Sequence, residues 1–220
     1  MKAVILSGGG DYSDPWHPFA QTSATVAALL QDAGFDVEVR DDVARAVTSM
    51  KASPRLLVVN FGSGGIPAEQ DQRTLSGLSR LLMGGAGMLG LHTASTLFPQ
   101  SAHWAGMLGG RWVRGTSMHP PHGRLRVRVT DSPLTSGLPD FDTVDEAYSL
   151  LAVEPGTTVV AGHDEHGTGQ PIWWYHRHQG IRVAYDALGH DADAYRAETH
   201  RLFLARAARW AARADSRPRP

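Results

Sequence analysis

Residues 55–92 read RLLVVNFGSGGIPAEQDQRTLSGLSRLLMGGAGMLGLH, which is two buried-strand patterns separated by one helical pattern. RLLVVNF (55–61) and AGMLGLH (86–92) are short apolar runs bounded by glycines, as expected for strands buried on both faces. Residues 67–83 between them predict a helix that ends at Gly84-Gly85. Strand, helix and strand in this order predict a right-handed βαβ unit in a parallel sheet.

The same alternation extends back to residue 2. Lys2–Ser7 is another buried-strand pattern, and it ends at three consecutive glycines. Apolar residues at helical spacing over 19–33 predict a helix, which Gly34 would end. Residues 35–39 and 41–50 predict a short strand and a weaker helix. The first half of the chain therefore predicts an α/β fold with a mostly parallel sheet.

The pattern changes after residue 111. Leu125, Val127 and Val129 alternate with arginines, which predicts a half-exposed strand. Further strands are expected over 158–161, 172–174 and 182–185, and a loop is expected over 138–143. A final helix is expected over about 194–214, with its arginines on a solvated face. We therefore expect one domain over 1–214 with a strand-rich second half, and a disordered tail over 215–220.

Composition excludes several kinds of chemistry. The 220 residues include no cysteine, so thiol nucleophiles, iron–sulfur clusters and disulfides are impossible. Lysine occurs only as Lys2 and Lys51, whereas histidine occurs 11 times. A net charge of −1 gives no support to nucleic-acid binding. No apolar run reaches the roughly 18 residues of a membrane span, and the first strand is too short for a signal-peptide core, so we expect a cytoplasmic protein.

Histidines follow the predicted strands at the points where ligands bind in open parallel sheets. His17 comes after the first strand and its glycines. This segment would either line a ligand-binding site or form a turn that binds no ligand. His92 begins a strand–turn–helix elbow, and His190 follows the last strand. His119 and His122 lie in a proline-rich loop that would hold a ligand or form a simple turn. Glu146 follows Asp145 near Tyr148, where the alternative is a pair of solvated acids.

Six segments, taken in order, resemble the ThuA-like, trehalose-utilisation family. They are GMLGLHTAS (87–95), LGGRW…HPP (108–121), SPLTSGLPDFDTVDEAY (132–148), PIWWY (171–175), RVAYDALGHD (182–191) and ARWAA (208–212). Each motif is weak alone, but their order and spacing over residues 1–213 are specific. The resemblance implies a flavodoxin-like, three-layer fold of the class I glutamine amidotransferase type, with the elbow at His92. Because that elbow carries no cysteine, glutamine hydrolysis by a thiol is excluded.

The resemblance also implies carbohydrate metabolism, on a sugar or a 3-keto-glycoside made by a partner sugar oxidoreductase. We expect a hydrolase, lyase or isomerase that uses His92 and Glu146 as acid–base catalysts. Substrate contacts are expected from His17, Trp104, Asp145, Tyr148 and Trp174, although core packing is the alternative for each aromatic residue. The rival hypothesis is a non-catalytic sugar-binding or scaffold protein. No nucleic-acid or membrane partner is expected.

A divalent transition metal is the one cofactor that the residues suggest. His92, His119 and His190 are the candidate ligands, with Glu146 as the base, and the set would suit Zn, Mn or Fe. The alternative is that these groups bind sugar hydroxyls without a metal. We predict that His92, His119, Glu146 and His190 meet at the carboxyl ends of the sheet.

Overall fold

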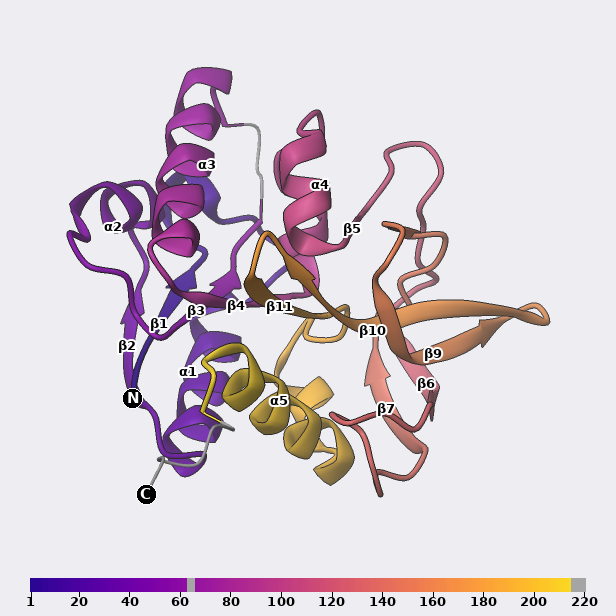
Figure 1. The fold of residues 1–220 in the computed structure, drawn as a ribbon. Coiled ribbons are helices and arrows are strands. Elements are labelled where there is room, and N and C mark those ends of the chain that lie inside the picture. The colour runs from indigo at the N-terminus through magenta and orange to yellow at the C-terminus, as the bar shows by residue number, and fades with distance from the viewer. Residues whose placement is uncertain (63–65, 215–220) are drawn as a thin grey trace, which may run out of the picture.

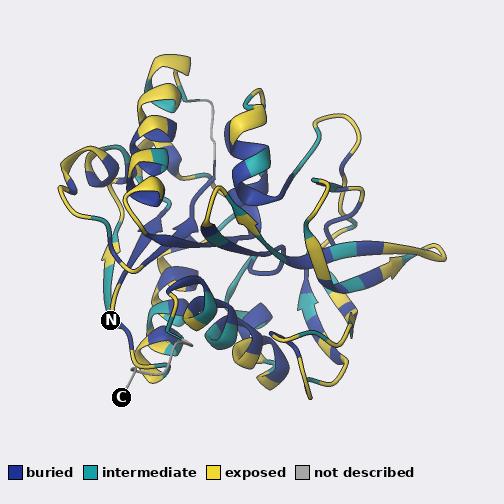
Figure 2. Ribbon diagram, in the orientation of Figure 1, coloured by how far each residue is buried: buried dark blue, intermediate teal, exposed yellow. Residues whose placement is uncertain are grey.

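One nine-stranded sheet forms the centre of the computed structural model, which describes residues 1–62 and 66–214 (Figure 1). The strands follow the order β2-β1-β3-β4-β11-β10-β9-β6-β7. Buried residues concentrate along this sheet and on the helix faces that cover it (Figure 2). The α/β fold predicted from the sequence is therefore confirmed. The tail predicted for residues 215–220 lies outside the described residues.

The first half of the sheet is parallel, as predicted. Its strands are β1 (Lys2–Ser7), β2 (Asp36–Arg40), β3 (Leu56–Asn60), β4 (Gly87–Leu91) and β11 (Ile181–Asp186). β1 pairs with β2 and β3, and β4 pairs with β3 and β11. Every residue of β3 and β4 is buried, which explains their uninterrupted apolar sequences. The order β2-β1-β3-β4-β11 is that of a flavodoxin-like sheet.

The second half of the sheet is antiparallel. It consists of β10 (Thr168–His178), β9 (Thr158–Glu165), β6 (Gly123–Val129) and β7 (Phe141–Asp145). A separate pair joins β5 (Gly110–Arg111) to β8 (Ala152–Val153). The loop predicted over 138–143 is partly wrong, because β7 begins at Phe141 and pairs with β6. In β7 the buried positions are Phe141, Thr143 and Asp145, so two of the three inward side chains are polar and hide the strand pattern.

Helices cover both faces of the sheet. α1 (Phe19–Asp32) and α5 (Glu198–Ala211) lie on one face, and α2 (Val43–Ser49), α3 (Ala68–Met83) and α4 (Ala102–Leu108) lie on the other (Figure 1). Short 3₁₀ helices are η1 (Gly10–Tyr12), η2 (His92–Thr96) and η3 (Ala192–Arg196). None of the helices in the described part of the chain is long and apolar enough to cross a membrane.

The last helix begins later than predicted. Residues 192–196 form η3, whose N-cap Asp191 accepts a hydrogen bond from the Asp193 amide, and α5 starts only at Glu198. The arginines of α5 also do more than face solvent. Arg206 donates to the Ser136 carbonyl at 2.8 Å, and so ties α5 to the loop before β7.

Candidate functional site

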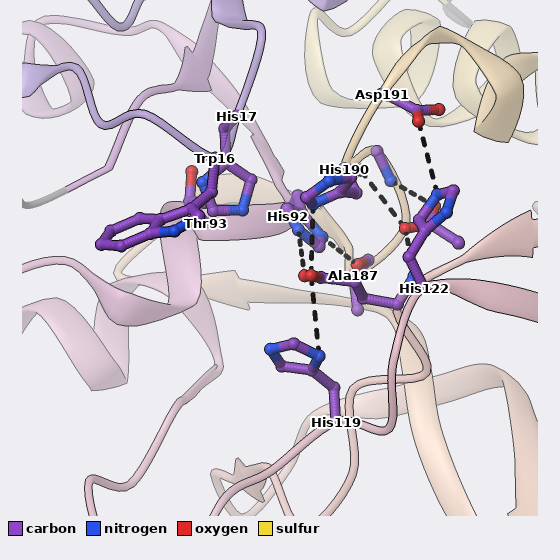
Figure 3. Close-up of polar contacts among 12 residues, drawn as sticks. Trp16, His17, His92, Thr93, His119, His122, Ala187, His190 and Asp191 are labelled. Carbon is purple, nitrogen blue, oxygen red and sulfur yellow. Dashed lines mark hydrogen bonds and ion pairs between the residues drawn. The ribbon is translucent and has the colours of Figure 1, made fainter.

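Four segments far apart in the chain bring His17, His92, Glu146 and His190 together. His17 lies on the loop after β1, His92 directly follows β4, Glu146 directly follows β7, and His190 lies just past β11. One possible ligand atom from each residue lies within 4.8 Å of the corresponding atoms of the other three. We call these four residues the His/Glu cluster. Figure 3 shows its three histidine rings turned toward one another.

His92 presents one defined nitrogen to the cluster. Its Nδ1 lies 2.7 Å from the Ala187 carbonyl oxygen, which can only accept, so Nδ1 carries the proton and donates (Figure 3). In the neutral ring Nε2 therefore holds the lone pair. It is buried, lies 3.3 Å from Glu146 Oε2, and has no hydrogen-bond partner among the described residues. A backbone carbonyl behind one nitrogen and a free lone pair on the other is the usual arrangement of a metal-binding histidine.

His17 is oriented in a similar way by Asp14. Both carboxylate oxygens of Asp14 lie 2.8 Å from His17 Nδ1, and Oδ1 also accepts the backbone amide of His17 at 2.9 Å. Nε2 of His17 is left buried, and nothing in the described ranges forms a hydrogen bond with it. Asp14 stands three residues before His17 in the sequence, so both residues of this contact come from the same loop.

Asp145 holds the segments that carry His190 and Glu146. Its carboxylate accepts the backbone amides of Gly189 at 2.7 Å, Glu146 at 2.7 Å and His190 at 3.3 Å. The side chain is buried, so the predicted substrate contact by Asp145 is replaced by a positioning role. With both segments held by Asp145, His190 Nδ1 lies 3.3 Å from Glu146 Oε1. This nitrogen also has no hydrogen-bond partner within residues 1–62 and 66–214.

The electrostatics of the His/Glu cluster follow from one carboxylate among several imidazoles. Burial alone would raise the pKa of Glu146, but contacts with His190 and His92 outweigh it and hold that pKa well below its usual range. Glu146 in turn raises the pKa of His190. Burial, and then the neighbouring His92, lower the pKa of His17 and favour its neutral form. Burial raises the pKa of Asp145 despite its three amide donors.

His119 lies beside the His/Glu cluster but outside it. Its Nδ1 is 3.6 Å from Glu146 Oε1 and 2.9 Å from the Pro120 carbonyl oxygen, and its side chain is exposed (Figure 3). Glu146 thus contacts His92, His119 and His190, the three residues expected around it. The geometry nevertheless favours His17, rather than His119, as the third imidazole facing a common point. His122 lies farther out, with Nε2 3.4 Å from Asp191 Oδ2.

The aromatic residues expected to bind substrate divide into two groups. Tyr148 lies against the site, with its ring centroid 4.3 Å from that of His92 and 5.7 Å from that of His119. Trp104 and Trp174 instead belong to the core, so the prediction that they contact substrate is wrong. They are 1% and 0% exposed, and their indole N–H groups donate to main-chain carbonyls, of Ala94 and Leu108 respectively.

The comparisons with known proteins agree with this fold. The chain matches the model of the ThuA family, described as trehalose utilisation, over residues 3–211. A ThuA-like protein from Parabacteroides merdae ATCC 43184 is similar at 17% identity with a TM-score of 0.75, covering 100% of this chain and 92% of that chain. No curated protein matches the chain in sequence.

Two further solved structures extend the comparison. A ThuA-like protein from Bacteroides uniformis ATCC 8492 is 17% identical, with a TM-score of 0.70 and coverage of 96% and 90% of the two chains. A cytoplasmic protein from Salmonella typhimurium LT2 is 12% identical, with a TM-score of 0.70 and coverage of 96% and 99%. Identities this low show a shared fold, whereas the family match spans nearly all of this chain and points to a carbohydrate-related role. The chain therefore belongs to the ThuA family and has its glutamine amidotransferase-like, flavodoxin-like fold.

Proposed function

We propose that this protein is an enzyme of carbohydrate metabolism that holds a divalent transition metal through His17, His92 and His190, with Glu146 beside the ion. One observation carries the proposal. Three buried imidazole nitrogens face the same small space, and none has a hydrogen-bond partner among the described residues. Leaving buried polar atoms unpaired costs about 1–3 kcal/mol each. A bound cation would displace any proton from these nitrogens, use all three lone pairs and offset that cost.

The donor set fits such an ion by its chemistry. Imidazole nitrogen and carboxylate oxygen suit Zn²⁺, and also Mn²⁺ or Fe²⁺ when water completes a larger shell. Asp14 behind His17 and the Ala187 carbonyl behind His92 are the hydrogen-bond acceptors that usually orient metal-binding histidines. Three protein nitrogens also leave a position open for water or substrate, as in catalytic zinc sites.

The substrate we propose is a sugar or a 3-keto-glycoside, supplied by a partner sugar oxidoreductase in the cytoplasm. The family description and the histidine-rich site support it. A bound ion would polarise a sugar carbonyl or activate a water molecule. Glu146, whose carboxylate oxygens lie 3.3 Å from His92 Nε2 and from His190 Nδ1, would take a proton from carbon or from water. His119 lies next to Glu146 on the exposed side and would exchange that proton with solvent.

Elemental analysis of the untagged protein, combined with assays on trehalose and 3-keto sugars, tests this proposal. We expect about one equivalent of Zn, Mn or Fe, turnover of a keto sugar, and loss of turnover on chelation. Glu146→Gln should keep the metal and lower kcat by about 10²- to 10⁴-fold, because an amide cannot accept the proton. Less than a tenth of an equivalent of metal, with turnover unaffected by chelator, would rule out the metal.

The second candidate is a non-catalytic sugar-binding protein on an amidotransferase-like fold. It is favoured by the elbow position, where His92 stands in a chain without cysteine and its Nδ1 is already engaged by the backbone. Sugar binding without any product, in protein that carries its full metal content, would support this candidate over the enzyme.

A further inference from the structure

Trp16 is the most conspicuous apolar side chain near the His/Glu cluster. Its side chain is 72% exposed, and it alone is exposed among the six tryptophans, all of which lie within the described residues. An indole offers a large, flat apolar face, and leaving it in water forgoes the burial that usually stabilises tryptophan. Exposed apolar surface of this kind often marks a ligand-binding site.

The loop around Trp16 holds the backbone of this residue beside the cluster. The backbone amides of Trp16 and His17 both donate to Asp14 Oδ1, each at 2.9 Å. Pro15 and Pro18 flank the pair and restrict the backbone further. Asp14 thus orients the His17 ring and the Trp16 backbone with a single carboxylate. In Figure 3 the indole lies on the side of His17 away from His190 and Asp191.

We propose that Trp16 is the platform on which a sugar ring of the substrate stacks while the neighbouring ring atoms reach the His/Glu cluster. This inference rests on the proposed function. The C–H face of a pyranose is apolar and flat, so it pairs with an indole, whereas its edge hydroxyls suit histidine and carboxylate. An indole has only two side-chain torsions, so it loses little conformational entropy when it binds. Trp16 would therefore set the affinity for the sugar without taking part in metal binding.

Two variants and one matched control test the platform. Trp16→Ala should weaken trehalose binding by about tenfold, and Trp16→Phe should weaken it less, because a smaller aromatic face remains. Metal content should stay unchanged in Trp16→Phe. Met83→Ala is the control, since Met83 is equally exposed at 72% but ends α3. Tryptophan fluorescence provides a second readout: trehalose should change the wild-type emission, and the change should be smaller in Trp16→Phe, where Trp112 beside Tyr148 and His119 is the tryptophan left near the site.

The outcomes separate this inference from the proposed function. Wild-type affinity for trehalose in Trp16→Ala, with full metal content, would overturn the platform and leave the proposed function standing. A wild-type protein that binds neither metal nor any tested sugar would overturn the proposed function itself. Loss of metal in Trp16→Phe would show that Trp16 only supports the His17 loop, and would also overturn the platform.

Discussion

The backbone of His92 adopts a conformation that side chains other than glycine rarely take, with φ at 39°. Two contacts hold it there: Nδ1 donates to the Ala187 carbonyl, and the His92 carbonyl accepts the Tyr185 hydroxyl at 2.7 Å. Strained residues of this kind cluster at functional sites, where the surrounding structure fixes them. In this chain the strain turns the His92 ring out of the sheet and toward Glu146.

Replacing His92 by alanine tests whether this geometry serves function or stability. We expect His92→Ala to lose metal binding and turnover, and to lose about 1–3 kcal/mol of stability, because it removes a hydrogen bond and a buried ring that packs against Tyr148. Metal analysis, an activity assay and thermal melting measure the three effects. His122→Ala serves as the control, because His122 lies outside the His/Glu cluster. An active variant that melts many degrees lower would instead make His92 a structural residue.

Single residues also show how far the sequence could predict the site. The positions of His92 and His190 in the site could be predicted from the sequence, because each residue follows a strand with a clear apolar run. Whether His17 or His119 is the third imidazole of the cluster depends on the conformation of their loops. Contacts with Asp14 and with the Pro120 carbonyl orient the two rings, and the hydrophobic periodicity of the sequence does not predict such contacts. Trp16 was missed and Trp104 misplaced for a related reason, since sequence spacing does not say which tryptophans the fold leaves at the surface.

At the scale of elements, a buried ion pair connects α5 to the end of β11. His200 Nε2 lies 2.5 Å from Asp186 Oδ2, and His200 Nδ1 lies 2.7 Å from the Ala194 carbonyl. Asp186 Oδ1 accepts from the Trp173 indole at 2.7 Å and from the Leu188 amide at 2.9 Å. Burial alone would lower the pKa of His200, but Asp186 outweighs it and raises that pKa. The pair thus fixes the turn that leads from β11 to His190.

Breaking this pair should destabilise the protein in a pH-dependent way. Asp186→Asn should lower the free energy of unfolding by about 3–5 kcal/mol, because it leaves a buried histidine without its partner charge. The pKa of His200 is higher in the folded protein than in the unfolded chain. Its charged form therefore stabilises the folded protein fully at pH values below the unfolded-state pKa, and this stabilisation is lost as the pH rises through the folded-state pKa. The cost of Asp186→Asn should therefore be greatest near pH 5 and shrink in alkaline solution.

Denaturant unfolding at several pH values measures that cost. Leu202→Ala, an exposed change on the same helix, is the control and should stay within about 0.5 kcal/mol of wild type. A cost for Asp186→Asn that does not vary between pH 5 and pH 9 would mean that His200 is neutral in the folded protein.

The two halves of the sheet differ in how well their sequences predicted them. In the parallel half, helices cover both faces, so β3 and β4 are continuously apolar and their ends were predicted within two residues. In the antiparallel half, β7 places Thr143 and Asp145 inward, and its first three residues, 141–143, were expected to be loop. Asp145 accepts hydrogen bonds from backbone amides in the segments that carry Glu146 and His190. This role in the site requires a polar residue at an inward position, and so the sequence of β7 lacks the alternating pattern of a strand.

At the scale of the whole molecule, the His/Glu cluster joins both halves of the sheet. His17, His92 and His190 follow strands of the parallel half, whereas Glu146 follows β7 at the far edge of the antiparallel half. An ion bound there would link segments that are separated by up to 173 positions between His17 and His190. Because the unfolded chain cannot present these four residues together, the ion would bind almost only the folded state.

Metal binding should therefore raise the melting temperature of the whole protein. A metal at about 100 times its Kd adds about 2.7 kcal/mol, which for a chain of this size corresponds to roughly 5–10 °C. Differential scanning fluorimetry of chelated protein, with and without Zn²⁺ or Mn²⁺, measures the shift. His17→Ala should abolish it, since one of three nitrogen ligands is gone, whereas His119→Ala should keep it. A shift that survives His17→Ala but disappears in His119→Ala would restore His119 as the third ligand and leave His17 to the substrate.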